Sequence, residues 1–86
     1  MKKSRGSPNQ KIFQELLKQV RINAGVRQSV LAKRLNKPQS FISKYESGER
    51  RLDIIELREV CLAVGISLEK FIDELERLIA EKKMEY

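Results

Sequence analysis

The sequence has no histidine, no tryptophan and a single cysteine among its 86 residues. It also lacks a glycine-rich phosphate loop and clustered carboxylates, so neither acid–base nor metal chemistry has its usual side chains. The lone Cys61 cannot form an internal disulfide or a cysteine-based zinc site, which is typical of a reducing compartment. These absences argue against an enzyme and against a metal or other cofactor, and no small-molecule ligand is evident.

Long apolar runs are also missing. No run approaches the roughly 20 residues of a membrane span, and the basic N-terminus is not followed by an apolar signal core. We therefore expect a cytoplasmic protein without a membrane partner.

The apolar residues that are present are mainly aliphatic. They make up 41% of the chain and include only three Phe and two Tyr, which suits a helical core better than aromatic-rich strands. At this length we expect one domain, close to the smallest that folds on a single apolar core.

Charge is distributed unevenly along the chain. Residues 1–51 carry a net charge of +10, whereas residues 52–86 carry −4. A basic region of this kind is the electrostatic footprint of a nucleic-acid partner, although a basic solvated surface gives the same composition.

Apolar residues recur at spacings of three and four in five segments, and no segment alternates with period two long enough for a strand. Ser7 and Pro8 predict the start of a helix that runs to about residue 24 before Gly25. Asp53 predicts the start of a helix that ends before Gly65, and Ser67 the start of another. We expect the apolar stripes to face inward, including Ala24, Val30 and Ile54.

Between these segments lie two short predicted helices, residues 28–35 and about 39–47. Asn36 and Pro38 favour a tight turn between them, and Gly48 ends the second. Two short helices so joined form a helix-turn-helix. We divide the chain into a flexible basic arm (1–7), one domain (8–80) and a charged end (81–86).

The stretch "VRQSVLAKRLNKPQSFISKYESGERR", residues 26–51, resembles the helix-turn-helix of the lambda-repressor and Cro-like family, also called Xre-type regulators. The resemblance extends from about Leu16 to Leu75. It implies an all-α, five-helix, lambda-repressor-like DNA-binding domain with an extended fifth helix. The sequence departs from the usual pattern at three positions. Arg27 and Pro38 stand where the family commonly has a Ser or Thr helix cap, and Asn36 stands where it commonly has glycine.

The second short helix presents an unusual outward face. Phe41, Ile42 and Tyr45 are spaced to reach the core, whereas the outward residues are short or planar hydrogen-bonding groups. Such groups can read base edges in the major groove, and acidic groups would repel phosphate. We predict that the base-reading residues are Gln39, Ser40, Ser43 and Lys44.

Phosphate contacts are expected around this helix. The resemblance assigns Gln28, at a helix N-terminus, to the DNA backbone. The candidate cations, of which we expect about half to touch DNA, are Arg27, Lys33, Lys37, Arg50 and Arg51. An N-terminal arm with Lys2, Lys3 and Arg5 either reaches round the duplex or has no role.

Glu46 is an acidic residue beside the predicted DNA-binding face, where a carboxylate would repel phosphate. The resemblance pairs Glu46 with Arg21 of the first helix, as a structural ion pair that locks the first and third helices together. The alternative is two exposed charges.

One short recognition helix reads only a few base pairs, so specific binding usually requires two half-sites and a dimer. The last helix has more apolar surface than a monomer core requires. We predict a homodimer interface drawn from Ile55, Phe71, Ile72, Leu75, Leu78 and Ile79. Alternatively these residues complete the monomer core and the protein dimerises only on DNA.

The function we predict is a sequence-specific, double-stranded DNA-binding transcriptional regulator of bacterial, phage or plasmid origin. A dimeric repressor on a two-fold symmetric operator is the leading form. A restriction-modification controller, an antitoxin and a protein-interaction adaptor with the same fold are the alternatives.

Overall fold

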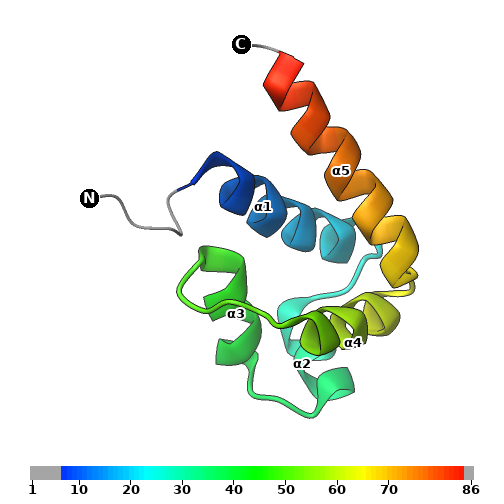
Figure 1. Cartoon of the computed structure of the whole chain (residues 1–86). Helices are drawn as coiled ribbons and strands as arrows, with labels where there is room; N and C mark the ends of the chain where they lie inside the picture. The colour runs from blue at the N-terminus through cyan, green and yellow to red at the C-terminus, as the bar shows by residue number, and fades with distance from the viewer. Residues whose placement is uncertain (1–6, 85–86) are drawn as a thin grey trace.

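Five α-helices form most of residues 7–84, the part of the chain that this structure, a computed structural model, describes (Figure 1). They are α1 (Pro8–Asn23), α2 (Gln28–Leu35), α3 (Gln39–Ser47), α4 (Ile54–Val64) and α5 (Leu68–Met84). These residues contain no strand, which confirms the all-α prediction. The expected arm lies outside the described residues except for residue 7. Helix α5 continues four residues past the expected domain boundary at residue 80.

Side-chain caps begin α1, α4 and α5. The Ser7 hydroxyl accepts a hydrogen bond from the Gln10 backbone N–H at 3.1 Å. At α4, Asp53 and Glu56 form a reciprocal capping box, in which each carboxylate accepts from the other residue's backbone N–H. By contrast, Arg27 and Pro38 cap α2 and α3 without a side-chain hydrogen bond. The two helices of the helix-turn-helix therefore begin with amide groups that no cap side chain satisfies.

The turn between α2 and α3 depends on a left-handed residue. Asn36 has φ 58° and ψ 46°, a conformation that asparagine tolerates better than most residues with a Cβ. The next N–H, that of Lys37, donates to the Ala32 carbonyl at 2.9 Å. Asn36 thus supplies the geometry that glycine commonly supplies in the family.

Gly48 ends α3 where a side chain would not fit. Its φ is 90°, and a Cβ there would lie 2.8 Å from Gln14 Oε1. Gly48 is itself buried, so α1 approaches the end of α3 very closely. The glycine is required both by its backbone conformation and by its neighbour.

The core lies where all five helices meet. Every helix contributes at least one side chain that is almost completely buried: Leu17, Leu31, Ile42, Tyr45, Val60, Cys61 and Phe71. Phe71 of α5 meets Phe13 of α1 edge to face, with ring centroids 6.0 Å apart. Arg34 adds a polar tie between α2 and α4, because its Nη1 donates to the Ala63 carbonyl at 2.7 Å.

Three residues expected to face inward are exposed instead. Ala24 lies past the last residue of α1, and Ile54 is the first residue of α4, so neither is covered by a neighbouring helix. Val30 sits one residue before the buried Leu31, which turns it about 100° away from the contact. The apolar pattern located the helices correctly, but the stripes are narrower than it suggested.

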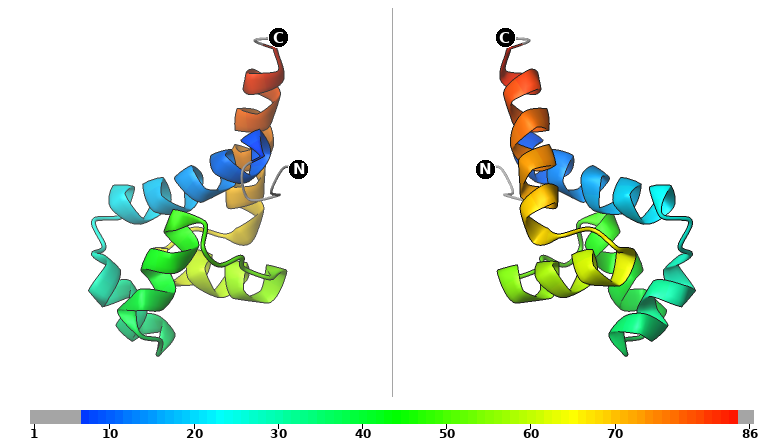
Figure 2. Two further views of the ribbon diagram at one scale, coloured as in Figure 1. Left: turned by 90° about the vertical axis from the view of Figure 1, so that its left-hand side faces the viewer. Right: turned by 90° about the vertical axis from the view of Figure 1, so that its right-hand side faces the viewer.

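The arrangement separates α3 from the end of α5. In Figures 1 and 2, α3 lies on one side of the helix cluster, and the carboxyl-terminal half of α5 projects away from it, past α1. No helix in the described residues is both long and apolar enough to cross a membrane.

Candidate nucleic-acid interface

The outward face of α3 carries no exposed acid. Gln39, Ser40, Ser43 and Lys44 are all exposed, while Ile42 and Tyr45 of the same helix are buried. The remaining charged residue, Glu46, has a side chain only 5% exposed. The four predicted base-reading residues therefore share an accessible surface that presents hydroxyl, amide and ammonium groups.

Two serine hydroxyls on this face donate hydrogen bonds within α3. Ser43 Oγ donates to the Ser40 carbonyl at 3.2 Å, and Ser47 Oγ donates to the Lys44 carbonyl at 3.1 Å. In this state Ser43 offers only its lone pairs, so it is suited to accept from an amino group of cytosine or adenine.

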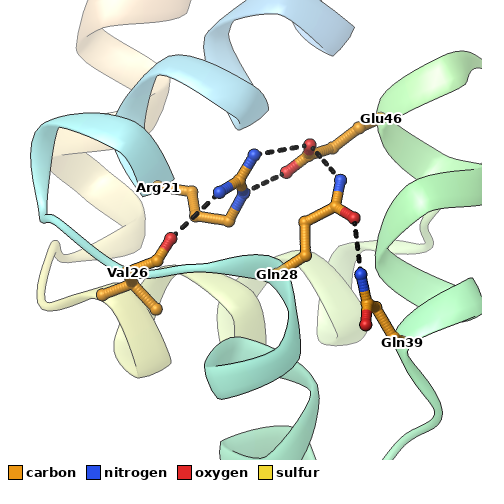
Figure 3. Close-up of polar contacts among 5 residues, drawn as sticks. All are labelled: Arg21, Val26, Gln28, Gln39 and Glu46. Atoms are coloured by element: carbon orange, nitrogen blue, oxygen red, sulfur yellow. Dashed lines mark hydrogen bonds and ion pairs between the residues drawn. The ribbon is translucent and has the colours of Figure 1, made fainter.

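Glu46 is held by α1 rather than left exposed (Figure 3). Arg21 Nε donates to Glu46 Oε2 at 2.7 Å, and Arg21 Nη2 donates to Glu46 Oε1 at 3.0 Å. The third nitrogen, Nη1, donates to the Val26 carbonyl at 3.0 Å. The hydrogen bond to Glu46 raises the pKa of Arg21. The expected pair is thus brought together, and it joins α1, α3 and the loop before α2.

Two glutamines extend this contact to the surface. Gln28 Nε2 donates to Glu46 Oε1 at 3.0 Å, and Gln39 Nε2 donates to Gln28 Oε1 at 3.3 Å. Gln28 was expected only at the DNA backbone. Its links to Glu46 and Gln39 join residues 18 and 11 positions apart, and no sequence pattern indicated them.

The predicted phosphate-binding cations are spread around α3. Arg27, Lys33, Lys37 and Arg51 are exposed. Lys37 Nζ lies 5.2 Å from the centre of the Phe41 ring, and Arg50 Cζ lies 4.7 Å from it. Phe41, predicted as a core residue, is half-buried, and its ring lies near two cations that flank α3 in the sequence.

Arg50 is engaged within the protein. Its Nη1 and Nη2 donate to the Glu56 carboxylate at 3.1 and 2.8 Å, and Nη1 also donates to the Arg51 carbonyl. The hydrogen bond from Arg50, with a second from the Asp53 backbone, lowers the pKa of Glu56 to about 2. A phosphate contact by Arg50, which is 40% exposed, would therefore compete with its pair to Glu56.

One of the six residues predicted for the dimer interface lies in the interior of the chain. Phe71 is completely buried in the chain's own core, so it cannot contact a partner. Ile72, Leu75 and Ile79 are half-buried on α5, and Ile55 of α4 is 60% exposed. Leu62, two turns after Ile55 on α4, is 55% exposed and was not predicted.

Leu78 has a different setting. It lines an open groove of about 880 Å³ between α1 and α5, together with Ile12, Leu16 and Val20 of α1. Lysine and glutamate side chains line the groove together with these aliphatic ones. One residue of the predicted interface therefore faces α1.

The comparisons with known proteins agree with this geometry. A helix-turn-helix family profile matches residues 17–71. An XRE-family-like protein from Pseudomonas syringae pv. tomato str. DC3000 is 41% identical, with a TM-score of 0.75, over 79% of this chain and 83% of that chain. This chain belongs to the Xre-type helix-turn-helix family of DNA-binding transcriptional regulators.

Two further solved structures are similar over almost their whole length. Both are mutants of the restriction-modification controller protein C.Esp1396I, 27% and 26% identical to this chain, with TM-scores of 0.78 and 0.80. Each match covers 86% of this chain, and 94% and 99% of the respective controller chain. No curated protein gives a significant match.

Proposed function

We propose that this regulator is a dimeric repressor that inserts α3 into the major groove at each half of a two-fold symmetric operator. The observation that carries the proposal is the acid-free outward face of α3, on which Gln39 is held by Gln28. A major groove about 12 Å wide admits such a helix, and its amide and hydroxyl groups match the donors and acceptors of base edges. Gln39, Ser40, Ser43 and Lys44 are the proposed base-reading residues.

The proposed backbone contacts surround this face. Gln28 uses one N–H for Glu46, which leaves the second for a phosphate oxygen. The uncapped N-termini of α2 and α3 add amide groups and partial positive charge. The exposed cations in this role are Arg27, Lys33, Lys37 and Arg51. Binding is expected to weaken with salt by about 0.9 log units per log unit of salt for each phosphate neutralised.

The proposed dimer uses the surface that α4 and α5 leave open. Ile55 is mostly exposed, and Ile72, Leu75 and Ile79 are half-buried. Leu78 is also half-buried, but it lines the groove between α1 and α5, so it would join the interface only at the edge of that groove. Both figures place the end of α5 far from α3, so a two-fold contact there leaves both recognition helices accessible.

The decisive experiment is selection of bound sites from random duplex DNA. A two-fold symmetric motif with half-sites about one helical turn apart would support the proposal. Binding that is weak, salt-insensitive and equal for all sequences would refute it and favour a protein-interaction adaptor. Sedimentation at micromolar concentration tests the dimer, since a single 10 kDa species would contradict it.

A second candidate, the restriction-modification controller, is favoured by the near-complete coverage of the two C.Esp1396I chains. Such a controller would activate at one site and repress at another. A reporter gene placed behind each selected site distinguishes a controller from a pure repressor. A pure repressor lowers expression from every site, whereas a controller raises it from at least one.

A further inference from the structure

We propose that Glu56, on α4, limits sequence-independent binding to DNA by holding the Arg50 guanidinium, which would otherwise join the phosphate contacts around α3. Glu56 acts here as a competitor of phosphate within the protein, and it need not touch DNA itself. The inference rests on the proposed insertion of α3 into the major groove. It concerns a cation that follows the last residue of α3 by three positions.

Arg50 lies beside α3 because the loop folds back on the end of that helix. The backbone N–H of Arg50 donates to the Lys44 carbonyl, one turn inside α3, at 3.2 Å. Arg50 Cζ lies 4.7 Å from the centre of the Phe41 ring, and Lys37 Nζ lies 5.2 Å from the same centre. Arg50 therefore shares an aromatic ring of α3 with Lys37, which is a proposed phosphate contact.

Glu56 holds Arg50 with both of its carboxylate oxygens. Arg50 Nη1 donates to Glu56 Oε1 at 3.1 Å, and Nη2 donates to Oε2 at 2.8 Å. Nη1 also donates to the Arg51 carbonyl at 2.8 Å. A guanidinium makes the same two-nitrogen contact with a phosphate, so the two anions require the same donors. A phosphate can bind the paired Nη groups only by displacing Glu56.

The Glu56 carboxylate is fixed in place and charged. Its Oε1 also accepts from the Asp53 backbone N–H at 3.0 Å, as part of the capping box that begins α4. The hydrogen bonds from Arg50 and from Asp53 lower the pKa of Glu56 to about 2, so it is ionised at neutral pH. A phosphate that displaced Glu56 would leave this charge unpaired beside a second anion. Repulsion between the two anions would then offset most of the gain from the new contact.

Lys37 provides the contrast at the same ring. It is exposed, and it takes part in none of the ion pairs among residues 7–84. The Arg50 side chain is also accessible, at 40% exposed. The carboxylate partner of Arg50, and not burial, is therefore what distinguishes the two cations.

The test measures binding of the full chain to a duplex of unrelated sequence over a range of salt concentrations. Glu56→Gln removes the charge that balances Arg50 but keeps an acceptor for the Asp53 N–H, since glutamine also serves in a capping box. We expect it to bind this duplex about fivefold more tightly at roughly 0.1 M salt, the effect of one added phosphate contact. The plot of log affinity against log salt should steepen by about 0.9.

Glu59→Gln is the matched control. Glu59 is an exposed glutamate three residues after Glu56 on α4, and it is not a hydrogen-bond partner of Arg50 in the described residues. Its replacement makes the same change of net charge, so any gain should be smaller and the salt slope should stay as in the parent. The double variant Arg50→Met/Glu56→Gln removes both charges and should bind as the parent does, because the gain depends on the released guanidinium.

Three results would overturn the inference. A gain for Glu56→Gln no larger than that for Glu59→Gln, with an unchanged slope, would mean that Arg50 does not reach phosphate. A gain that persists in the double variant would mean that it comes from loss of the acid alone. A double variant that binds more weakly than the parent, with a slope shallower by about 0.9, would mean that Arg50 already contacts phosphate beside Glu56.

These results leave the proposed function in place. The role of α3 at an operator fails on a different observation, namely selection of bound sites that recovers no motif.

Discussion

Replacing Arg21 with alanine tests how α1 and α3 are held together. The substitution removes both donations to Glu46, at 2.7 and 3.0 Å, and the donation to the Val26 carbonyl. Glu46 keeps only the hydrogen bond from Gln28. Since the Glu46 side chain is 5% exposed, a charge that was paired becomes a nearly buried charge without a counterion.

The expected loss is about 3 to 5 kcal/mol of unfolding free energy, the usual cost of removing one partner from a buried pair. Domains of this size are stable by about 5 to 15 kcal/mol, so the loss is a large part of the total. The melting temperature should fall by at least about 10 °C. Arg21→Lys should lie between the parent and Arg21→Ala, because an ammonium group keeps the charge but cannot make the planar two-nitrogen contact.

Urea unfolding followed by far-ultraviolet circular dichroism measures the change. Arg77→Ala is the matched control, because Arg77 also pairs with two glutamates, Glu74 and Glu81, but on an exposed part of α5. It should change stability very little. The double variant Arg21→Met/Glu46→Met removes both charges and should be more stable than Arg21→Ala.

A loss below about 1 kcal/mol for Arg21→Ala would refute this reasoning, since that is the range of solvent-exposed pairs. A double variant no better than Arg21→Ala would show that the arginine stabilises by packing rather than by balancing Glu46.

The remaining predictions concern base recognition, stability at low pH and dimerisation. Gln39→Ala should cost about 1 to 3 kcal/mol at one base position per half-site in competition binding, with nonspecific affinity nearly intact; an equal drop in both would make it a backbone contact. Glu56 has its pKa lowered from 4.5 to about 2, so its stabilisation is present above about pH 4.5 and lost as the pH falls to about 2. The melting temperature of Glu56→Gln should therefore fall less than that of the parent between about pH 4.5 and pH 2. Parallel plots of melting temperature against pH for the two proteins would contradict this. Ile55→Glu should shift sedimentation at micromolar concentration toward a 10 kDa monomer, whereas Ile54→Glu, an equally exposed neighbour outside the predicted interface, should not; identical behaviour would exclude Ile55 from the interface.

The helices were predictable because their boundaries are encoded locally. Ser7 and Asp53 satisfy the first amides of their helices, and Asn36, with φ 58°, makes the turn as its short polar side chain suggested. Exposure at the ends of the apolar stripes was not predictable in this way. Ile54 and Val30 fit the helical period but are exposed. The period shows which residues share a face of a helix, but it does not show how far a neighbouring helix extends along that face.

The sequence predicted which residues form the candidate site, but only part of the hydrogen bonds and ion pairs between them. The outward position of Gln39 follows from the helical period of α3. Arg21 and Glu46 are 25 residues apart, and only the family resemblance linked them before the structure did. Arg50 illustrates the limit, since composition offered it to DNA while the fold placed Glu56 against it.

By itself the sequence determined the number of helices, their caps and turns, and the outward position of Gln39 on α3, because each depends on residues within a few positions of one another. The tertiary structure alone decided that Phe71 is interior, that Gln28 stands between Glu46 and Gln39, and that α5 leaves the helix cluster. These depend on how distant helices pack, and a hydrogen bond between remote side chains forms only after that packing has set the distance between them.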